Sequence, residues 1–328
     1  MSLIEVTLGI EIGGAYTAFG LVDSTGKCFI ASRINSKNNE SPESLFKRLF
    51  TKFKKIYHEN AHKYDLLGIG IGAPSANYYK GTVELSSNLN WVYVNIVELV
   101  KTYYDLPIVI TNDANAAALG EMKFGAAKGM KNFIQLTLSK GFGSGIVVDG
   151  NLVYGYDGFA GEMGHTIIEK NGRYCGCGRR GCLETYVSTA GLIRTYFELL
   201  SQLNEVSVLK SFPPDSLTAK LIYNAAINGD KLALSAFERT GQILGEALAN
   251  AVAYLSPQAI ILSEGLASTG DLLIKPTKYY MELNMLNLFK DKVEILVSAL
   301  NEGDSAILGA SALVWHEIQK ERKYLLRK

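Results

Sequence analysis

This chain of 328 residues has no long apolar run. No segment approaches the roughly 20 consecutive apolar residues that a membrane-spanning helix needs, so we expect no membrane as a partner. An excess of charge of one sign is missing too: 33 lysine and arginine residues are balanced by 32 aspartate and glutamate residues, which gives a formal net charge of +1. A balanced charge provides no electrostatic footprint for nucleic acid, so we expect no nucleic-acid partner either.

Cysteine is scarce, with four residues, and the N-terminus shows no signal-peptide pattern. The chain runs from Met1 directly into the strand-like segment 4–12, and we therefore expect a cytoplasmic protein whose thiols stay reduced. Cys28 lies in a strand-like segment and is expected to be a small core residue. The other three cysteines fall between residues 175 and 182, and this clustering indicates a specific role.

Two domains are the default expectation at this length. The segments 4–26 and 132–150 share one arrangement: an apolar strand, a glycine-containing loop and a second apolar strand are followed by an aspartate and a glycine turn. This repeat predicts two related α/β halves, each with a glycine hairpin facing a shared cleft. We expect an N-terminal domain of residues 1–115, completed by a C-terminal helix at 312–328, and a second domain of residues 116–311.

The spacing of apolar residues predicts the principal elements. Glycine and proline residues separate them, as these residues commonly do. Helical periodicity and short apolar runs typical of buried strands predict helices at 42–62, 94–104 and 114–124 and strands at 66–71, 108–111, 133–138, 146–148 and 259–262.

A histidine and three cysteines form the most specific local pattern. His165 is followed by Cys175-Gly-Cys177-Gly-Arg-Arg-Gly-Cys182, which is a complete tetrahedral ligand set for Zn²⁺. The intervening glycines allow the backbone to fold tightly around an ion. A disulfide and unliganded surface thiols are the other interpretations, and the odd local number of cysteines argues against a disulfide. We predict a structural zinc site.

Asn112 and Asp113 lie between the predicted strand 108–111 and the predicted helix 114–124. Ligands of open α/β sheets bind at the C-terminal ends of the strands. One interpretation is that Asp113 only caps the helix. The other is that its carboxylate acts as a general base on a substrate hydroxyl that reaches hydrogen-bonding distance.

Two further acids accompany the predicted metal ligands. Glu162 precedes His165 by three residues, and Glu184 follows Cys182 by two. Zinc on one imidazole nitrogen would leave the other as an N–H donor of fixed tautomer. Carboxylates and N–H donors together suit a ligand with many hydroxyl groups, whereas the alternative for both acids is a solvated loop charge.

Glycines recur in the two loops at 13–14 and 141–145. Both loops resemble phosphate cradles, in which backbone N–H groups approach the phosphates closely. Hairpin glycines are common, so each loop is weak evidence by itself. Their symmetric placement in the two halves strengthens the interpretation.

Two motifs resemble signatures of the ROK family (repressors, open reading frames, sugar kinases). The first is Gly161-Glu162-Met163-Gly164-His165 together with the segment from Cys175 to Glu184, and the second is Thr111-Asn112-Asp113-Ala114-Asn115-Ala116. The resemblance extends over nearly the whole chain and is strongest to the glucokinases of the family.

This resemblance implies an actin-like (ribonuclease H-like) two-domain sugar kinase fold with a cleft between the domains, assembled as a homodimer. It implies phosphorylation of a hexose by ATP with Mg²⁺, most often of glucose at the 6-hydroxyl. Asp113 falls on the catalytic base of the family. Its other functional positions fall on sugar-binding residues Asn88, Asn112, Glu162, His165 and Glu184, nucleotide-binding residues Glu11, Gly13, Gly14, Gly141, Gly143 and Gly265, and zinc ligands His165, Cys175, Cys177 and Cys182.

Three departures from the family pattern all concern the nucleotide. The usual Asp-x-Gly-Gly-Thr is Glu11-Ile12-Gly13-Gly14-Ala15, the usual Gly-Thr-Gly is Ser139-Lys140-Gly141, and the usual paired glycines are replaced by Ser263-Glu264-Gly265. They leave a second possibility, a sugar-binding ROK protein with weak or lost kinase activity.

Family repressors carry a helix-turn-helix before the first strand. Only a few residues precede the first predicted strand of this chain, so we expect no DNA-binding role. Relatives act on glucose, N-acetylmannosamine, N-acetylglucosamine, fructose or allose. Ser75, Tyr78 and Tyr79 are candidates for selecting among such sugars.

Overall fold

The computed structural model of the chain describes residues 3–37, 39–86, 88–203, 205–301 and 304–325. The chain divides into two compact units. Unit 1 consists of Met1–Met130, Leu152–Gly161 and Ala299–Lys328, and unit 2 consists of Lys131–Asn151 and Glu162–Ser298.

This division differs from the expected boundaries at residues 115 and 312. Helix α3 (Asp113–Phe124) belongs to unit 1, where it packs against α8 (Ser305–Leu325), and α8 begins seven residues earlier than expected. The segment Leu152–Gly161 also belongs to unit 1, although it lies inside the expected second domain. Residues 326–328 of the expected terminal helix lie outside the described residues.

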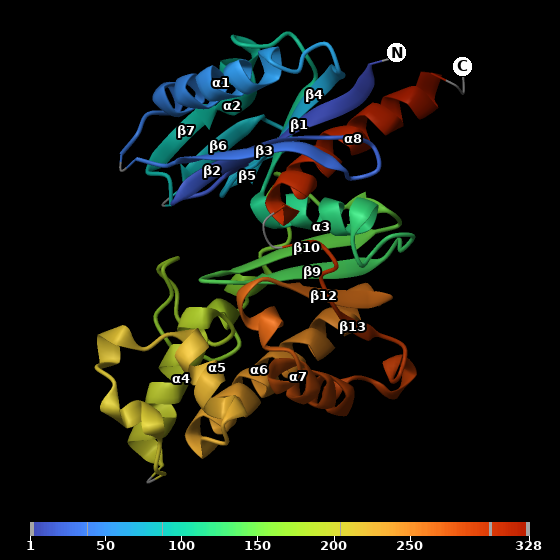
Figure 1. Cartoon of the computed structure of the whole chain (residues 1–328). Coiled ribbons are helices and arrows are strands. Elements are labelled where there is room, and N and C mark those ends of the chain that lie inside the picture. The colour runs from blue at the N-terminus through green and yellow to red at the C-terminus, as the bar shows by residue number, and fades with distance from the viewer. Residues whose placement is uncertain (1–2, 38, 87, 204, 302–303, 326–328) are drawn as a thin grey trace. The chain divides into compact units, whose positions relative to one another are not determined.

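The main sheet of unit 1 has the strand order β3-β2-β1-β4-β8. Its first three strands form an antiparallel meander, whereas β1, β4 and β8 run parallel. Helices α1 and α2 lie on one face of this sheet and α8 on the other (Figure 1). The strands are β1 (Ile4–Ile12), β2 (Tyr16–Val22), β3 (Cys28–Asn35), β4 (Tyr64–Gly72) and β8 (Ile108–Thr111).

A smaller antiparallel sheet of unit 1 connects β4 to α2. Its strand order is β5-β6-β7, with bounds Ala76–Asn77, Thr82–Ser86 and Trp91–Asn95. Helix α2 (Ile96–Lys101) follows at once and is shorter than the predicted helix at 94–104. The first two predicted residues belong to β7 instead, because they pair with β6.

Helix α1 (Pro42–His58) begins at a strong capping sequence. The Ser41 hydroxyl accepts a hydrogen bond from the N–H of Ser44 at 3.2 Å, and proline stands in the first turn, where an N–H has no intrahelical partner. The helix ends four residues before the predicted limit of 62, because residues 59–62 offer no apolar side chain larger than alanine.

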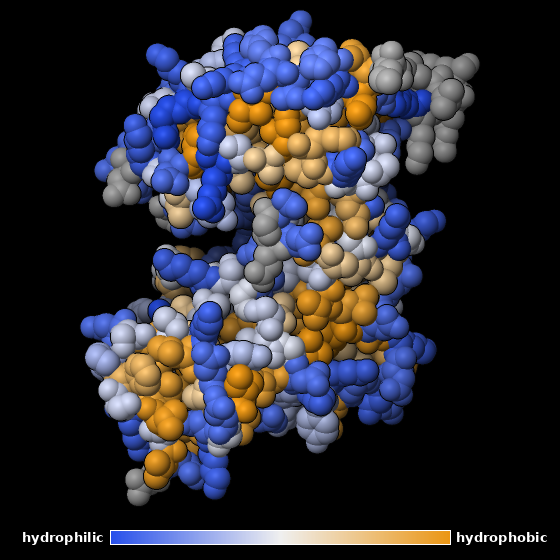
Figure 2. All heavy atoms as spheres, viewed as in Figure 1, coloured by the Kyte–Doolittle hydropathy of each residue, from blue (hydrophilic) through white to orange (hydrophobic). Residues whose placement is uncertain are grey.

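Aromatic side chains fix α1 on the sheet. Phe46, Phe50 and Phe53 are buried in one cluster with the inward side chains of β1 and β4. The outward surface over α1, at the top of the view, is hydrophilic (Figure 2). The helix therefore has the two-sided character that its sequence periodicity predicts.

Glycines let α8 lie directly on the sheet. A methyl group at Gly9 of β1 would lie 2.3 Å from the carbonyl oxygen of Ile307, and one at Gly70 of β4 would lie 1.9 Å from that of Ala310. Real side chains never approach backbone so closely. The helix axis is therefore set by the absence of β-carbons on the two central strands.

We expect Gly70→Ala to lower the free energy of unfolding by about 1–3 kcal/mol, because the new methyl group must push the backbone of α8 away. Chemical denaturation measures the change. Gly68→Ala is the matched control on the same strand: its methyl group would lie 2.8 Å from the Val314 side chain and 3.0 Å from the carbonyl oxygen of Pro107, so its backbone contact is 1.1 Å longer than the one at Gly70, and a smaller loss is expected. Equal losses for the two variants would contradict the close packing at Gly70.

Unit 2 repeats the strand pattern of unit 1. Its sheet has the order β11-β10-β9-β12-β13, with β9 and β10 antiparallel and β9, β12 and β13 parallel. The prediction of two related halves is thereby confirmed at the level of topology. The strands are β9 (Phe133–Leu138), β10 (Phe142–Val148), β11 (Asn151–Leu152), β12 (Ala259–Ser263) and β13 (Glu294–Val297).

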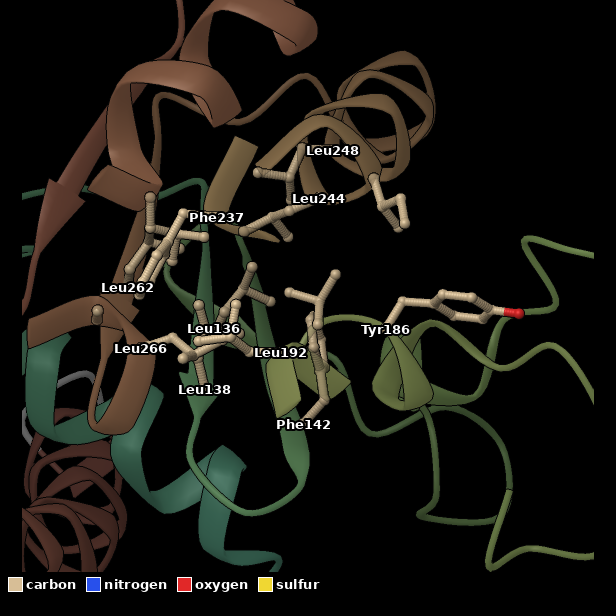
Figure 3. Close-up of a cluster of buried hydrophobic side chains, with 14 of the residues drawn as sticks. Leu136, Leu138, Phe142, Tyr186, Leu192, Phe237, Leu244, Leu248, Leu262 and Leu266 are labelled. Atoms are coloured by element: carbon tan, nitrogen blue, oxygen red, sulfur yellow. The ribbon is translucent and has the colours of Figure 1, made fainter. Parts of the chain in front are cut away.

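Helices of unit 2 cover one face of this sheet. Apolar side chains from β9, β12, α4 and α6 form a single core cluster, shown in Figure 3: Leu136, Leu138, Leu262, Leu192, Phe237, Leu244 and Leu248. Among the described residues no helix combines the length and apolar composition that a membrane crossing requires. The helices are α4 (Thr189–Gln202), α5 (Ala219–Ile227), α6 (Lys231–Leu255) and α7 (Asp271–Asn284), with short 3₁₀ turns at Val208–Ser211, Pro214–Ser216 and Asn287–Phe289.

Candidate functional site

Four side chains of unit 2 converge as the cysteine spacing predicts. The ligand atoms of His165, Cys175, Cys177 and Cys182 all lie within 4.8 Å of one another. The Cys175 Sγ is 3.7 Å from His165 Nδ1, and the Cys177 and Cys182 sulfurs are 3.6 Å apart. Zn–S bonds of about 2.3 Å at tetrahedral angles require sulfur separations of about 3.8 Å. The cluster, which we call the cysteine loop site, therefore has the donor set and dimensions of a structural zinc site.

The thiols of this site are available for a metal. All four cysteines of the chain lie in the described part of the structure, and none forms a disulfide. Although burial acts in the opposite direction, hydrogen bonding to Arg179 lowers the pKa of the Cys177 thiol to about 6. Because the thiolate is the form that binds metal, this arginine favours the ligand state of Cys177 at neutral pH. Burial raises the pKa of the Cys175 and Cys182 thiols, so a bound cation would have to favour their thiolates.

Arg173 fastens the cysteine loop to helix α4. Its guanidinium donates to both carboxylate oxygens of Glu198, at 2.8 and 2.6 Å, and to the carbonyl oxygen of Thr185 at 2.7 Å. It also lies 4.2 Å from the ring centre of Tyr186, whose ring Figure 3 shows reaching away from the core cluster. Such a bidentate arginine–carboxylate pair adds geometric definition as well as energy.

Glu184 links the cysteine loop to the hairpin between β9 and β10. It lies on the 3₁₀ turn Leu183–Thr185, and its Oε2 accepts a hydrogen bond from the N–H of Phe142 at 3.0 Å. Its Oε1 is 3.8 Å from the Cys175 Sγ. A methyl group at Gly141 would lie 2.9 Å from this carboxylate, so the glycine leaves the space it occupies. Glu184 is thus a fixed, half-buried group rather than a solvated loop charge.

Strand β10 supports the turn that carries His165. The turn spans Met163–His165, and its first N–H donates to the Ser144 hydroxyl at 3.1 Å. A methyl group at Gly164 would lie 2.6 Å from the carbonyl oxygen of Phe142, so only glycine allows this approach. Glu162 precedes the turn and is exposed, while His165 is half-buried.

In unit 1, Asn112 and Asp113 form the junction of β8 and α3. Asn112, not Asp113, is the capping residue, and its side chain accepts a hydrogen bond from the N–H of Ala114 at 2.9 Å. Asp113 is the first helical residue, and its Oδ1 accepts from the same N–H at 2.8 Å. Burial raises the pKa of the Asp113 carboxyl above its usual range, although the backbone hydrogen bonds act against the shift.

Glu11 occupies the same sheet edge. The register aligns Glu11 of β1, Gly72 of β4 and Thr111 of β8 in one row at the C-terminal ends of parallel strands. The Glu11 carboxylate extends over Gly72, since a methyl group there would lie 2.1 Å from its Oε2. Glu11 and Asp113 thus belong to neighbouring strand ends, where open α/β sheets bind ligands.

The predicted loop with Gly13 and Gly14 is a tight turn between β1 and β2. The N–H of Gly13 donates to the carbonyl oxygen of Tyr16 at 3.0 Å, and its own carbonyl accepts from the Ser36 hydroxyl at 2.8 Å. A methyl group at Gly14 would lie 3.3 Å from the carbonyl oxygen of Asn88. The exposed turn that carries Asn88 therefore lies against the glycine turn.

The second glycine loop is shorter than expected. Strand β10 begins at Phe142, and Gly143 pairs with Thr137 inside the sheet, so only residues 139–141 form the loop. Gly143 thus lies in a strand and not in the loop where it was expected, and its nucleotide-binding role stays a prediction.

Gly265 begins the 3₁₀ turn Gly265–Thr269 after β12. A methyl group at Gly265 would lie 2.2 Å from the carbonyl oxygen of Leu138. Glu264, just before it, has φ 58° and ψ 169°, a region essentially restricted to glycine. The departure from paired glycines therefore places a strained glutamate at this strand end.

We expect Glu264→Gly to raise the free energy of unfolding by about 1–3 kcal/mol, the usual cost of such backbone conformations. Denaturant titration measures the change. Glu264→Ala is the control, because it removes the carboxylate but keeps the β-carbon. If glycine proved no more stabilising than alanine, the strain would lie elsewhere.

Three residues of this region were not assigned by the sequence analysis. Ser144 holds the turn before His165, and Arg173 holds the cysteine loop to α4. Arg179 contacts Cys177 and donates to the carbonyl oxygen of His165 at 2.8 Å. The position of the two arginines, within or beside the run of cysteines, could have indicated their role in holding the cysteine loop. Nothing in the sequence distinguishes Ser144.

The chain has the actin-like two-domain fold of ROK sugar kinases. Residues 7–317 match the sequence profile of the ROK family. The chain belongs to this family, as the two motifs of the sequence indicate.

Individual relatives include both kinases and repressors. A glucokinase of Halalkalibacterium halodurans is 32% identical over 311 residues, which is 94% of each chain. A xylose repressor of Caldicellulosiruptor bescii is 31% identical over 309 residues, covering 94% of this chain and 77% of the repressor. The crystal structure of a ROK family glucokinase from Streptomyces griseus in complex with glucose and AMPPNP matches with a TM-score of 0.77 and 28% identity, over 94% of this chain and 98% of that one.

Proposed function

We propose that this chain is a sugar kinase that transfers a phosphoryl group from ATP to a hexose, with glucose at the 6-hydroxyl as the first substrate to test. Asp113 accepts the proton of the sugar hydroxyl. The hydroxyl oxygen forms a bond to the γ-phosphorus, the bond from that phosphorus to the β–γ bridging oxygen breaks, and ADP leaves.

The observation that carries this proposal is the junction of β8 and α3. Asn112 is the capping residue of α3, and the Asp113 carboxylate shares with it the N–H of Ala114, so Asp113 is not the only acceptor at this helix end. The raised pKa of Asp113 brings its basicity closer to the working pH, which favours general-base catalysis. The glucokinases among the relatives support a sugar kinase activity, and the role of Asp113 within it is our proposal.

Sugar recognition is assigned to Asn88, Asn112, Glu162, His165 and Glu184. Zinc on Nδ1 of His165, the nitrogen that faces Cys175, would leave Nε2–H as a donor of fixed tautomer. Glu184 is held by Phe142 through one oxygen, which orients the carboxylate before a sugar arrives. Preorganised donors and acceptors of this kind suit a polyhydroxylated ligand.

For the nucleotide we assign Glu11 to the hydrated Mg²⁺ that accompanies ATP, and the glycine turn at 13–14 and the loop at 139–141 to the phosphates. The AMPPNP bound to the Streptomyces griseus glucokinase supports ATP as the donor. Gly265 is assigned to the nucleoside side of the site.

A second candidate function is sugar binding with weak or lost phosphoryl transfer. The strained Glu264 and the bulk of Glu11 over Gly72 favour it, because both place a carboxylate where the nucleotide segments of the family have smaller or shorter residues. The similarity to xylose repressors supports it as well.

A coupled kinase assay tests the proposal. The panel contains glucose, fructose, allose, N-acetylglucosamine and N-acetylmannosamine, with ATP, GTP and polyphosphate as donors, and calorimetry measures binding of each sugar in parallel. Turnover with ATP supports the kinase. Sugar binding without phosphorylation by any donor favours the second candidate. If no sugar binds and no phosphorylation is detected, both candidates are overturned.

A further inference from the structure

The segment Leu152–Gly161, which we call the crossing segment, leads directly into the residues assigned to the sugar. The chain leaves unit 2 after Asn151, belongs to unit 1 through the crossing segment, and returns to unit 2 at Glu162. Gly155, Gly158 and Gly161 have φ angles of 72°, 91° and 97°, which favour glycine. The N–H of Ala160 donates to the carbonyl oxygen of Tyr154 at 3.0 Å, so the segment is a closed loop.

An aromatic contact holds this loop on unit 1. The ring of Tyr154 stacks on that of Tyr78, with centroids 4.1 Å apart and planes at 9°, and Tyr79 meets Tyr154 at 5.9 Å and 62°. Burial raises the pKa of both Tyr78 and Tyr154 above the usual range, so both rings stay neutral. The Tyr154 hydroxyl lies beside the side chain of Thr111, which directly precedes Asn112.

An amide contact fixes the other side of the loop. Asn77 is fully buried, and its Nδ2 donates to the carbonyl oxygen of Asp157 at 2.7 Å. Its Oδ1 accepts from the N–H groups of Tyr79 and Lys80, each at 3.1 Å. A methyl group at Gly158 would lie 2.8 Å from this Oδ1, so the loop backbone rests directly on the amide.

We propose that Asn77, Tyr78 and Tyr154 are positioning residues for sugar recognition, which act by anchoring the crossing segment from which Glu162 and His165 follow. None of the three needs to touch the sugar. An anchored Gly161 leaves less backbone freedom to be lost when the following residues order around a ligand, and preorganisation of this kind increases affinity. The inference rests on the proposed sugar site but not on phosphoryl transfer.

Tyr154→Ala and Tyr154→Phe test the proposal. The probe is the sugar of the panel that the unaltered protein binds most tightly. We expect Tyr154→Ala to raise the Kd and KM for this sugar about ten-fold with a smaller change in kcat. The variant loses the orientation of the sugar-binding residues but keeps the proposed base, Asp113. Tyr154→Phe keeps the stack and should restore both constants. Tyr254→Ala, which removes an exposed tyrosine of α6, is the matched control and should leave Kd unchanged.

Hydrogen exchange of the loop amides provides the readout that separates the outcomes. Faster exchange at Ala160 together with weaker sugar binding supports the proposal, and faster exchange with unchanged Kd overturns it. Asn77→Asp provides a second route if Tyr154→Ala fails to fold, since it replaces the donor to Asp157 by an acceptor and should also weaken binding. The Kd is measured without ATP. If the protein binds sugar but transfers no phosphoryl group, the kinase proposal is refuted, whereas the anchoring role of the three residues can still be tested.

Discussion

Asp113→Asn is expected to lower kcat by about 10²–10⁴-fold while the Kd for the sugar changes little. General bases typically contribute a factor of this size. Asparagine has nearly the same shape and can still accept a hydrogen bond from the N–H of Ala114, but it cannot take up a proton. Steady-state kinetics and calorimetry with the preferred sugar measure the two constants.

Asn112→Asp is the informative companion variant, because it keeps a capping side chain at the start of α3 and leaves Asp113 in place. It should retain the folded state and a far larger kcat than Asp113→Asn, whereas the Kd for the sugar should rise, because Asn112 is itself assigned to the sugar. Near-full turnover of Asp113→Asn would show that Asp113 is only a residue of the first helical turn, and the reaction would then need another base.

The pH dependence gives an independent check on the same carboxyl. Because burial raises the pKa of Asp113, the deprotonated base becomes depleted as the pH falls, and the acidic limb of kcat should lie above the ordinary aspartate range of about 4. Stability depends on pH in the opposite direction to kcat. Because the pKa of Asp113 is higher in the folded state, its protonation stabilises the fold below the pKa of the unfolded state, and this stabilisation is lost as the pH rises through the pKa of the folded state. Any residual activity of Asp113→Asn should lack this acidic limb.

Much of the fold could be predicted because short apolar runs bounded by glycine or proline leave few choices. The strands at 108–111 and 133–138 were predicted at their observed limits. Strand β10 was truncated in the prediction, because Gly143 and Gly145 within it carry the signal of a loop. Helix α8 was predicted to begin late, since its first turns pack through small residues such as Gly309 and Ala310, which give little hydrophobic periodicity.

In the candidate site, too, the sequence predicts which residues gather but not how they are arranged. The spacing of the cysteines was sufficient to predict the cysteine loop site, because one histidine and three cysteines in one short segment have few other uses. Which of Asn112 and Asp113 caps α3 was not predictable, since adjacent residues that both favour capping are equivalent in a sequence. The unusual Glu264 was visible as a departure from paired glycines, but its strained φ and ψ angles depend on the tertiary path of the chain.

Cys177→Ser is expected to lower the zinc affinity of the cysteine loop site by about 10²–10³-fold. A structural zinc ion supplies about 10–16 kcal/mol in zinc-finger peptides, so one of four ligands accounts for about 2.5–4 kcal/mol. Elemental analysis and competition with a chromogenic chelator measure the loss. Cys28→Ser is the matched control, because Cys28 lies outside the cluster and donates only to the carbonyl oxygen of Ile30, at 3.4 Å.

The same variant should also weaken sugar binding, although Cys177 itself is not assigned to the sugar. Zinc would fix the ring of His165 through Nδ1, and loss of groups that orient a metal-bound histidine commonly costs about 10–100-fold in metal affinity or activity. Arg173 and Glu198 hold the backbone of the loop without the metal, so we expect the variant to remain folded and the effect to appear in the Kd for the sugar. Unaltered protein that contains no zinc after purification without chelators would refute the zinc assignment. A zinc-depleted variant with unchanged sugar affinity would instead separate the metal from sugar recognition.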